Sequence, residues 1–218
     1  MGGPNITINE NNMTEILSSG IVDYYITDSQ AGGEQSFASL VNAKLNKFSP
    51  LHADKSISGI WYLTEDGKAK YVNSLEWKKH IDWLPSPFTN GLVDKFFEDG
   101  LTPMIETNRG CPFHCTFCVW GSQDTSKVSQ FSIERVKNDL RYIARKSKKD
   151  LLLINDANFG LFKSRDLEIA KYIKSLNKQY NWPKTVVTNF GQLQKEESIA
   201  VANELRGIAT FRQSSQTV

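Results

Sequence analysis

Three cysteines, the only ones in this chain of 218 residues, lie together between positions 111 and 118. Cys111, Cys115 and Cys118 have the spacing C-x3-C-x2-C. Thiolates are the usual ligands of iron–sulfur clusters, and a cubane cluster normally takes four of them. Three thiolates leave one iron without a cysteine, and an open coordination position is what catalysis at a metal requires. The spacing therefore predicts a metal centre that accepts an outside ligand.

The number and clustering of the cysteines also indicate the cellular compartment and the alternative kinds of metal site. A disulfide framework uses an even number of cysteines spread along the chain, whereas this set is odd and clustered. We therefore expect a reducing compartment, the cytoplasm. A structural zinc site needs a fourth protein ligand, which His114, His52 or His80 could supply. Zinc sites more typically pair two C-x2-C motifs, and the chain has one, so a zinc-binding interaction module is the alternative.

Phe117, directly before the third cysteine, completes a recognisable pattern. The loop resembles the signature of the radical S-adenosylmethionine (SAM) superfamily, C-x3-C-x-aromatic-C. The resemblance implies a [4Fe-4S] cluster on Cys111, Cys115 and Cys118, SAM on the fourth iron, and Phe117 beside the adenine. It implies one-electron cleavage of SAM to a 5′-deoxyadenosyl radical that attacks a small-molecule substrate. A reductant such as flavodoxin or ferredoxin is the expected partner.

Polar residues after the later predicted strands are further candidates for binding SAM. In the family, the loop after the second strand contacts the SAM amino group, most often through glycine-glycine-glutamate. This sequence departs from that version, and Asp156 or Asn158 offers an acceptor oxygen instead. The alternative is a helix-entry turn built from turn-forming residues. The full set of candidates is Phe117, Asp156, Asn158, Thr188, Gln213 and Ser214.

From about residue 103 the sequence alternates strands with helices. Residues 104–107, 151–155, 185–188 and 208–211 have strand composition. Amphipathic segments follow three of these strands, and Ser132 and Ser164 are predicted to be N-caps. This alternation predicts a parallel α/β layout. By resemblance, residues 103–218 form the N-terminal portion of a radical SAM (βα) barrel.

The upstream segments resemble the end of a cobalamin-binding domain. The resemblance rests on Gly2-Gly3-Pro4, on the predicted strand 22–27 followed by Gly33-Glu34, and on the proline-containing segment 84–88. We expect residues 1–50 to be the remnant of a doubly wound cobalamin-binding-like domain and residues 51–102 to form a hairpin and linker. The hairpin is predicted to turn at Asp66-Gly67.

The resemblance implies a cobalamin-associated enzyme, with methyl transfer as a candidate reaction. The aspartate-x-histidine-x-x-glycine cobalt-ligand motif does not occur in the sequence. We therefore expect a fragment of a longer parent protein, and cobalamin as a cofactor of that parent. A catalytically inactive fragment is a further alternative.

Charge and hydropathy limit the other classes of function. The formal net charge is +2, so the chain lacks the basic surface typical of a nucleic-acid-binding protein. The longest apolar runs fall far short of the roughly 20 residues that span a bilayer. We therefore expect no membrane partner and no nucleic-acid partner.

Overall fold

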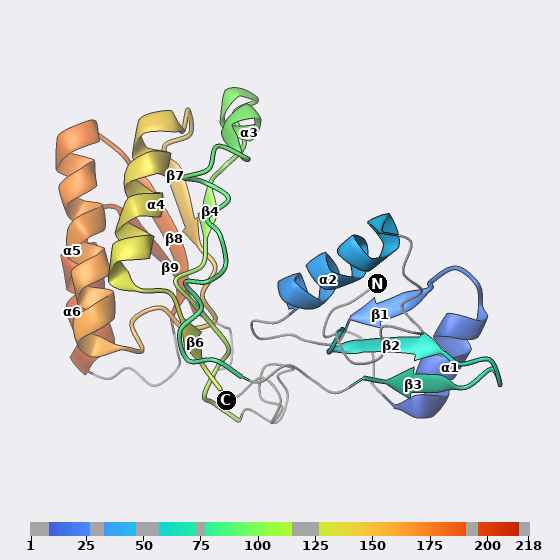
Figure 1. Ribbon diagram of the computed structural model, residues 1–218. Helices are drawn as coiled ribbons and strands as arrows, with labels where there is room; N and C mark the ends of the chain where they lie inside the picture. The colour runs from blue at the N-terminus through green and yellow to red at the C-terminus, as the bar shows by residue number, and fades with distance from the viewer. Residues whose placement is uncertain are drawn as a thin grey trace. The chain divides into compact units, whose positions relative to one another are not determined.

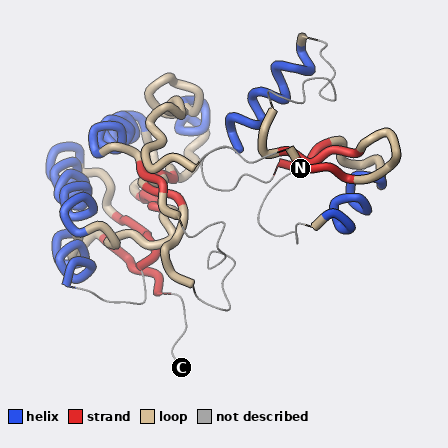
Figure 2. Tube along the Cα trace, turned by 60° about the horizontal axis from the view of Figure 1, so that its bottom comes forward, coloured by secondary structure: helices blue, strands red, loops and turns tan. Residues whose placement is uncertain are grey.

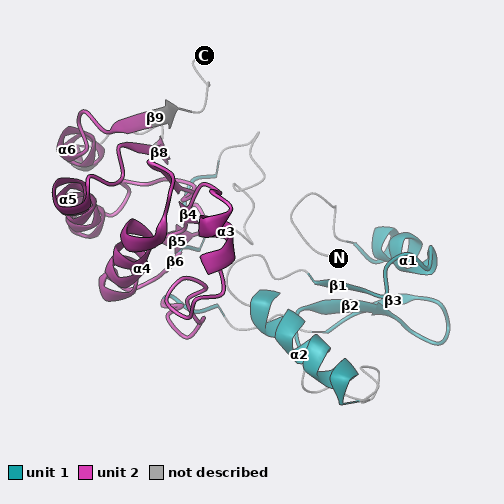
Figure 3. Cartoon of the chain, turned by 90° about the horizontal axis from the view of Figure 1, so that it is seen from above, with its two compact units in different colours: residues 1–79, 112–128 teal, residues 80–111, 129–218 magenta. Residues whose placement is uncertain are grey.

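The structure is a computed structural model that describes residues 9–26, 33–46, 57–72, 77–114, 127–190 and 196–213. The chain divides into two compact units, which Figure 3 colours separately. The first unit comprises residues 1–79 and 112–128, and the second comprises residues 80–111 and 129–218. The predicted division at residues 50 and 102 stays a prediction.

The first unit contains a three-stranded antiparallel sheet in the order β1-β2-β3. Its strands are β1 (Tyr24–Ile26), β2 (Ile60–Leu63) and β3 (Ala69–Tyr71). The β2–β3 hairpin is confirmed, and Gly67 takes the positive φ of 78° that its tight turn requires. The strand and the hairpin, predicted to belong to different segments, share one sheet because β1 pairs with β2.

The described residues of the first unit include the helices α1 (Glu10–Ser18) and α2 (Gly33–Leu45). The N-cap of α1 is Asn9, whose side chain accepts a hydrogen bond from the amide of Asn12. Met13 and Leu17 of α1 pack with Tyr25 of β1 in one buried cluster. This small core ties α1 to the sheet.

The second unit is built on a parallel sheet in the order β4-β7-β8-β9. The strands are β4 (Met104–Ile105), β7 (Leu151–Ile154), β8 (Thr185–Phe190) and β9 (Ala209–Gln213). The connecting helices α4 (Ile133–Lys146), α5 (Lys163–Tyr180) and α6 (Glu196–Glu204) all lie on the same side of the strands (Figures 1 and 2). The predicted alternation of parallel strands and helices is confirmed. A short helix, α3 (Asp94–Glu98), precedes β4.

Burial distinguishes the two faces of this sheet. Alternate residues of the central strands are buried, namely Leu152, Ile154, Val186 and Thr188. Successive side chains of a strand point to opposite faces, so these residues share the face that the helices cover. Met104, on the other face, is 51% exposed. All four strands have their carboxyl ends at one edge, where parallel α/β folds place ligands.

The helix starts differ in one respect from the predictions. The Ser132 cap of α4 is confirmed, because its side chain accepts from the amide of Arg135 at 3.1 Å. The prediction that Ser164 caps α5 is wrong, since the N-cap is Phe162, two residues earlier, and α5 begins at Lys163. The carboxylate of Asp166, in the first turn, accepts from the amide of Phe162 instead. Asp166 thus ties the residues that precede α5 to the first turn of the helix.

Candidate functional site

A short two-stranded ladder frames the cysteine loop. β5 (Asn108–Arg109) pairs antiparallel with β6 (Ser129–Gln130), so the chain enters and leaves the loop side by side. Gly110, between β5 and Cys111, has a φ of 97° that side-chain-bearing residues avoid. Cys111 therefore lies two residues after the end of β5, next to this glycine, and its exposed fraction is 8%.

The described cysteine contacts one of the predicted site residues. The Asn158 Nδ2 donates to the Cys111 Sγ at 3.0 Å, and both residues are buried. Cys115, Phe117 and Cys118 lie outside the described residues. Within the described ranges, no group of three histidine, cysteine, aspartate or glutamate side chains is placed to hold a metal ion. Whether a cluster fits is therefore judged from the chemistry of the available donors. Cys111 is a buried thiol that accepts an N–H hydrogen bond, and two more cysteines follow in the same loop, which suits an iron–sulfur cluster.

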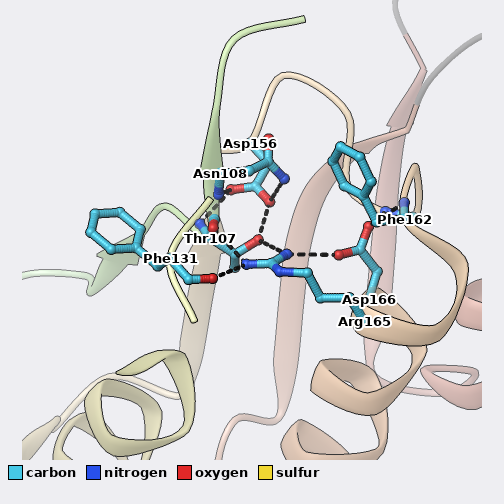
Figure 4. Close-up of polar contacts among 8 residues, drawn as sticks. Thr107, Asn108, Phe131, Asp156, Phe162, Arg165 and Asp166 are labelled. Carbon is cyan, nitrogen blue, oxygen red and sulfur yellow. Dashed lines mark hydrogen bonds and ion pairs between the residues drawn. The ribbon is translucent and has the colours of Figure 1, made fainter. Parts of the chain in front are cut away.

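Asp156 lies beneath the start of the loop and is fully buried. Its carboxylate accepts from the amide of Thr107 at 2.6 Å and from the Thr107 Oγ1 at 2.5 Å. The amide and the side-chain Nδ2 of Asn108 donate to it at 3.3 Å and 2.7 Å (Figure 4). Asp156 therefore faces the protein in this arrangement, and it fixes the two residues that lead into the cysteine loop.

Burial sets the protonation of this carboxyl. It raises the pKa of Asp156 to about 7, because removal from water disfavours the charged form. The hydrogen bonds from Thr107 and Asn108 lower this pKa, and the negative charge of Asp166 raises it. Asp156 thus changes charge near neutral pH.

Arg165, from the first turn of α5, joins the two sides of the ladder. Its guanidinium donates to the carbonyl oxygen of Thr107 at 2.6 Å and to that of Phe131 at 2.9 Å. It also donates to the Thr107 Oγ1 at 3.1 Å and pairs with the Asp166 carboxylate at 2.9 Å (Figure 4). Thr107 precedes β5 and Phe131 follows β6, so one side chain closes the base of the cysteine loop.

Asp166 orders the loop between β7 and α5. Its Oδ2 accepts from the amides of Gly160 at 3.0 Å and Phe162 at 2.9 Å. The carbonyl oxygen of Gly160 accepts from the Ser198 Oγ at 3.2 Å. The loop that carries Asp156 and Asn158 is therefore held by side chains from α5 and α6.

The remaining predicted site residues lie at or beyond the same edge of the sheet. Thr188, on β8, is 1% exposed, and its hydroxyl has no hydrogen-bond partner among the described residues. Gln213 is the last residue of β9, in register with Phe190. Ser214 lies outside the described residues. The proposed contacts of these three residues with SAM stay predictions.

Four residues of the site were not predicted from the sequence: Thr107, Asn108, Arg165 and Asp166. Asp166 carried a usable signal, because acidic residues in the first turn of a helix commonly satisfy its free amides. Arg165 carried none, since an arginine at the start of a helix is ordinarily solvated.

Relatives of known name match parts of the chain, although no protein-family model matches it. The cobalamin-dependent radical SAM methyltransferase TokK of Streptomyces tokunonensis is 39% identical over 114 residues, 50% of this chain and 16% of the relative. The uncharacterized methyltransferase PH0819 of Pyrococcus horikoshii is 31% identical over 185 residues, 84% of this chain and 38% of the relative. The chain thus spans well under half the length of these relatives.

Solved structures show the same fold. The radical SAM methyltransferase TsrM of Kitasatospora setae, solved with tryptophan substrate and a SAM analogue, gives a TM-score of 0.67 at 14% identity. The alignment covers all of this chain and 41% of that one. The cobalamin-dependent radical SAM enzyme OxsB, solved with aqua-cobalamin, gives a TM-score of 0.65 at 19% identity over 96% of this chain and 30% of that one.

The fold and these relatives define a class of enzymes, the radical SAM proteins. Within this class the chain is related to cobalamin-dependent methyltransferases, of which it matches a part. The resemblance drawn from the cysteine loop is thereby confirmed. In the described part of the chain, no helix is both long enough and apolar enough to cross a membrane.

Proposed function

We propose that the chain carries the cluster-binding part of a cobalamin-associated radical SAM methyltransferase. The observation that carries the proposal is the framed cysteine loop. Cys111 leaves β5 as a buried thiol that accepts from Asn158, and Arg165 closes the base of the loop. A site that is ordered at its base before a metal binds suits a cofactor that must be held rigidly.

Cys111, Cys115 and Cys118 are the proposed cluster ligands. When bound, a [4Fe-4S] cluster with SAM on its fourth iron supplies the one-electron chemistry of this class. Phe117, Asn158, Thr188, Gln213 and Ser214 are proposed to contact SAM, because the strands that lead to the last three share one carboxyl edge. Asp156 joins them as a candidate only if its bonds to Thr107 and Asn108 are broken.

The architecture proposed for the parent protein follows the same reasoning. The parallel sheet with helices on one side belongs to residues 103–218, which are proposed to be the N-terminal portion of a (βα) barrel. Residues 1–50 are proposed to be a remnant of a doubly wound cobalamin-binding-like domain, and residues 51–102 a hairpin and linker. The substrate is proposed to be a small molecule, as the tryptophan in the TsrM structure is for that protein. A flavodoxin-like or ferredoxin-like reductant and a cytoplasmic location complete the proposal.

Anaerobic reconstitution with iron and sulfide tests this function. We expect a brown protein with about four irons per chain, and cleavage of SAM after reduction. Cys115→Ala should lose the iron. His114→Ala is the matched control within the loop and should keep it. A colourless product that holds one zinc per chain, and loses it in His114→Ala, would instead support the zinc-binding module.

A further inference from the structure

The amide of Asn158 is placed to donate to a cluster ligand. Its Nδ2 lies 3.0 Å from the Cys111 Sγ, and the two residues are both 8% exposed. A thiolate bound to iron has no proton and can only accept hydrogen bonds. The amino end of the Asn158 amide must therefore face the sulfur, as it does here.

The backbone that follows Asn158 is held by hydrogen bonds from three other parts of the second unit. The amide of Phe159 donates to the carbonyl oxygen of Asn189 at 3.0 Å, and Phe159 is fully buried. Gly160 follows with its amide on Asp166 and its carbonyl oxygen on Ser198. These bonds hold the backbone on both sides of Phe159, the residue after Asn158, and so fix the segment that carries the Asn158 side chain.

A buried hydrogen bond from an N–H group to a cluster sulfur stabilises negative charge on that sulfur. One-electron reduction of a cluster places additional negative charge on the iron and its thiolates. Hydrogen bonds to the sulfurs are among the factors that set the potentials of iron–sulfur clusters. Because Asn158 and Cys111 are shielded from water, the attraction between the N–H dipole and the sulfur is weakly screened.

We propose that Asn158 tunes the cluster, stabilising its reduced state by donating a hydrogen bond to the Cys111 thiolate. This inference rests on the proposed function, since it requires a cluster on Cys111. It gives Asn158 a role at the cluster itself, distinct from contact with the SAM amino group. That amino group would need an acceptor oxygen from Asn158, whereas the sulfur uses the donor Nδ2.

Three variants of the full chain separate these roles. Asn158→Leu keeps a similar size and removes the donor. Asn158→Asp keeps the shape and places a carboxylate against the sulfur. Asn155→Ala is the control, because Asn155 is an exposed amide on the same loop.

The measurement is the midpoint potential of the reconstituted cluster, by anaerobic redox titration followed by electron paramagnetic resonance. For Asn158→Leu we expect about a tenfold smaller equilibrium constant for reduction, equivalent to about 59 mV for a one-electron couple. Asn158→Asp should shift further in the same direction, and Asn155→Ala should match the parent. If Asn158→Leu binds a full complement of iron and its midpoint potential is unchanged, the inference is overturned. The same holds if this variant loses affinity for SAM while its midpoint potential stays the same.

A second measurement tests the inference even if the Asn158 variants fail to bind a cluster. Pulsed electron paramagnetic resonance of the reduced parent protein, grown with ¹⁵N-labelled asparagine, should show a weak nitrogen coupling to the cluster. Absence of this coupling overturns the inference even if Asn158→Leu never binds iron. If the parent protein itself binds no iron, both the proposed function and the inference fail. If it binds a cluster that shows no nitrogen coupling, only the inference fails.

Discussion

The Arg165 guanidinium donates to the carbonyl oxygen of Thr107 at 2.6 Å, across 58 positions of sequence. The same group reaches the carbonyl oxygen of Phe131 on the other side of the ladder. Its charge is balanced by Asp166, which is fully buried. One side chain thus satisfies two backbone acceptors and a buried carboxylate at the base of the cysteine loop.

Replacing Arg165 with alanine should destabilise the second unit strongly. The change leaves a buried carboxylate without its cation, a loss that typically costs about 3–5 kcal/mol. We expect the free energy of unfolding of the metal-free protein to fall by about 3 kcal/mol or more, measured by urea denaturation. Arg141→Ala, on the exposed side of α4, is the control and should change it by no more than about 0.5 kcal/mol. Equal effects in the two variants would contradict the role given to Arg165.

Thr107 should require its hydroxyl rather than its methyl group. The Oγ1 donates to Asp156 and accepts from Arg165, so Thr107→Val leaves the buried Asp156 carboxylate and the partly buried Arg165 guanidinium each one hydrogen bond short. We expect a loss of about 1–3 kcal/mol in unfolding free energy. Thr107→Ser keeps the hydroxyl and should lose clearly less, a comparison that differential scanning calorimetry can make. A serine variant as unstable as the valine variant would assign the cost to packing.

Stability should depend on pH through Asp156. Burial raises its pKa from 3.8 to about 7 in the folded protein, so between these values the folded state holds a proton that the unfolded state has released. Its contribution to the unfolding free energy is therefore complete below about pH 4 and is lost as the pH rises through about 7.

Asp156→Asn cannot titrate and isolates this effect. The stability of the parent protein relative to the variant should fall as the pH rises from about 4 to about 7, by at most about 1.4 kcal/mol per unit. Urea denaturation of both proteins across this range measures it. A difference that stays constant with pH would show that Asp156 is ionised throughout.

The small core of the first unit should depend on Met13. This side chain is fully buried against Leu17, Tyr25 and Ala69. Met13→Ala removes most of it and should cost about 2–5 kcal/mol in unfolding free energy. Ile21→Ala is the control, because Ile21 is 86% exposed. Loss of near-ultraviolet dichroism at lower urea in Met13→Ala alone is the expected result.

Local signals in the sequence predicted much of the second unit. The continuous apolar run at β7, the amphipathic spacing in α4 and the serine cap at Ser132 each depend on neighbouring residues. For that reason the strand–helix alternation, the parallel sheet and the β2–β3 hairpin could be read in advance. The partner of β1 could not, because a strand of three residues does not specify which edge it joins.

The spacing of the cysteines predicted where the site lies along the chain, whereas the hydrogen bonds around it were not predictable. Asp156 and Asn158 were expected to face a ligand, yet their side chains form hydrogen bonds with Thr107, Asn108 and Cys111, between 47 and 49 positions away. No pattern of nearby residues encodes such pairs. Thr107 and Asn108 are ordinary turn-forming residues by composition, and only the folded sheet brings Asp156 beneath them.

The long separations around the loop also set an order of events during synthesis. The ribosome completes Cys118 well before it makes Arg165, and translation adds about 5–20 residues per second. Until α5 has emerged and packed, Thr107 and Phe131 lack the side chain that joins them. The base of the cysteine loop is therefore still open for some seconds during synthesis. A metal centre that depends on this closed base could form only after α5 has been translated.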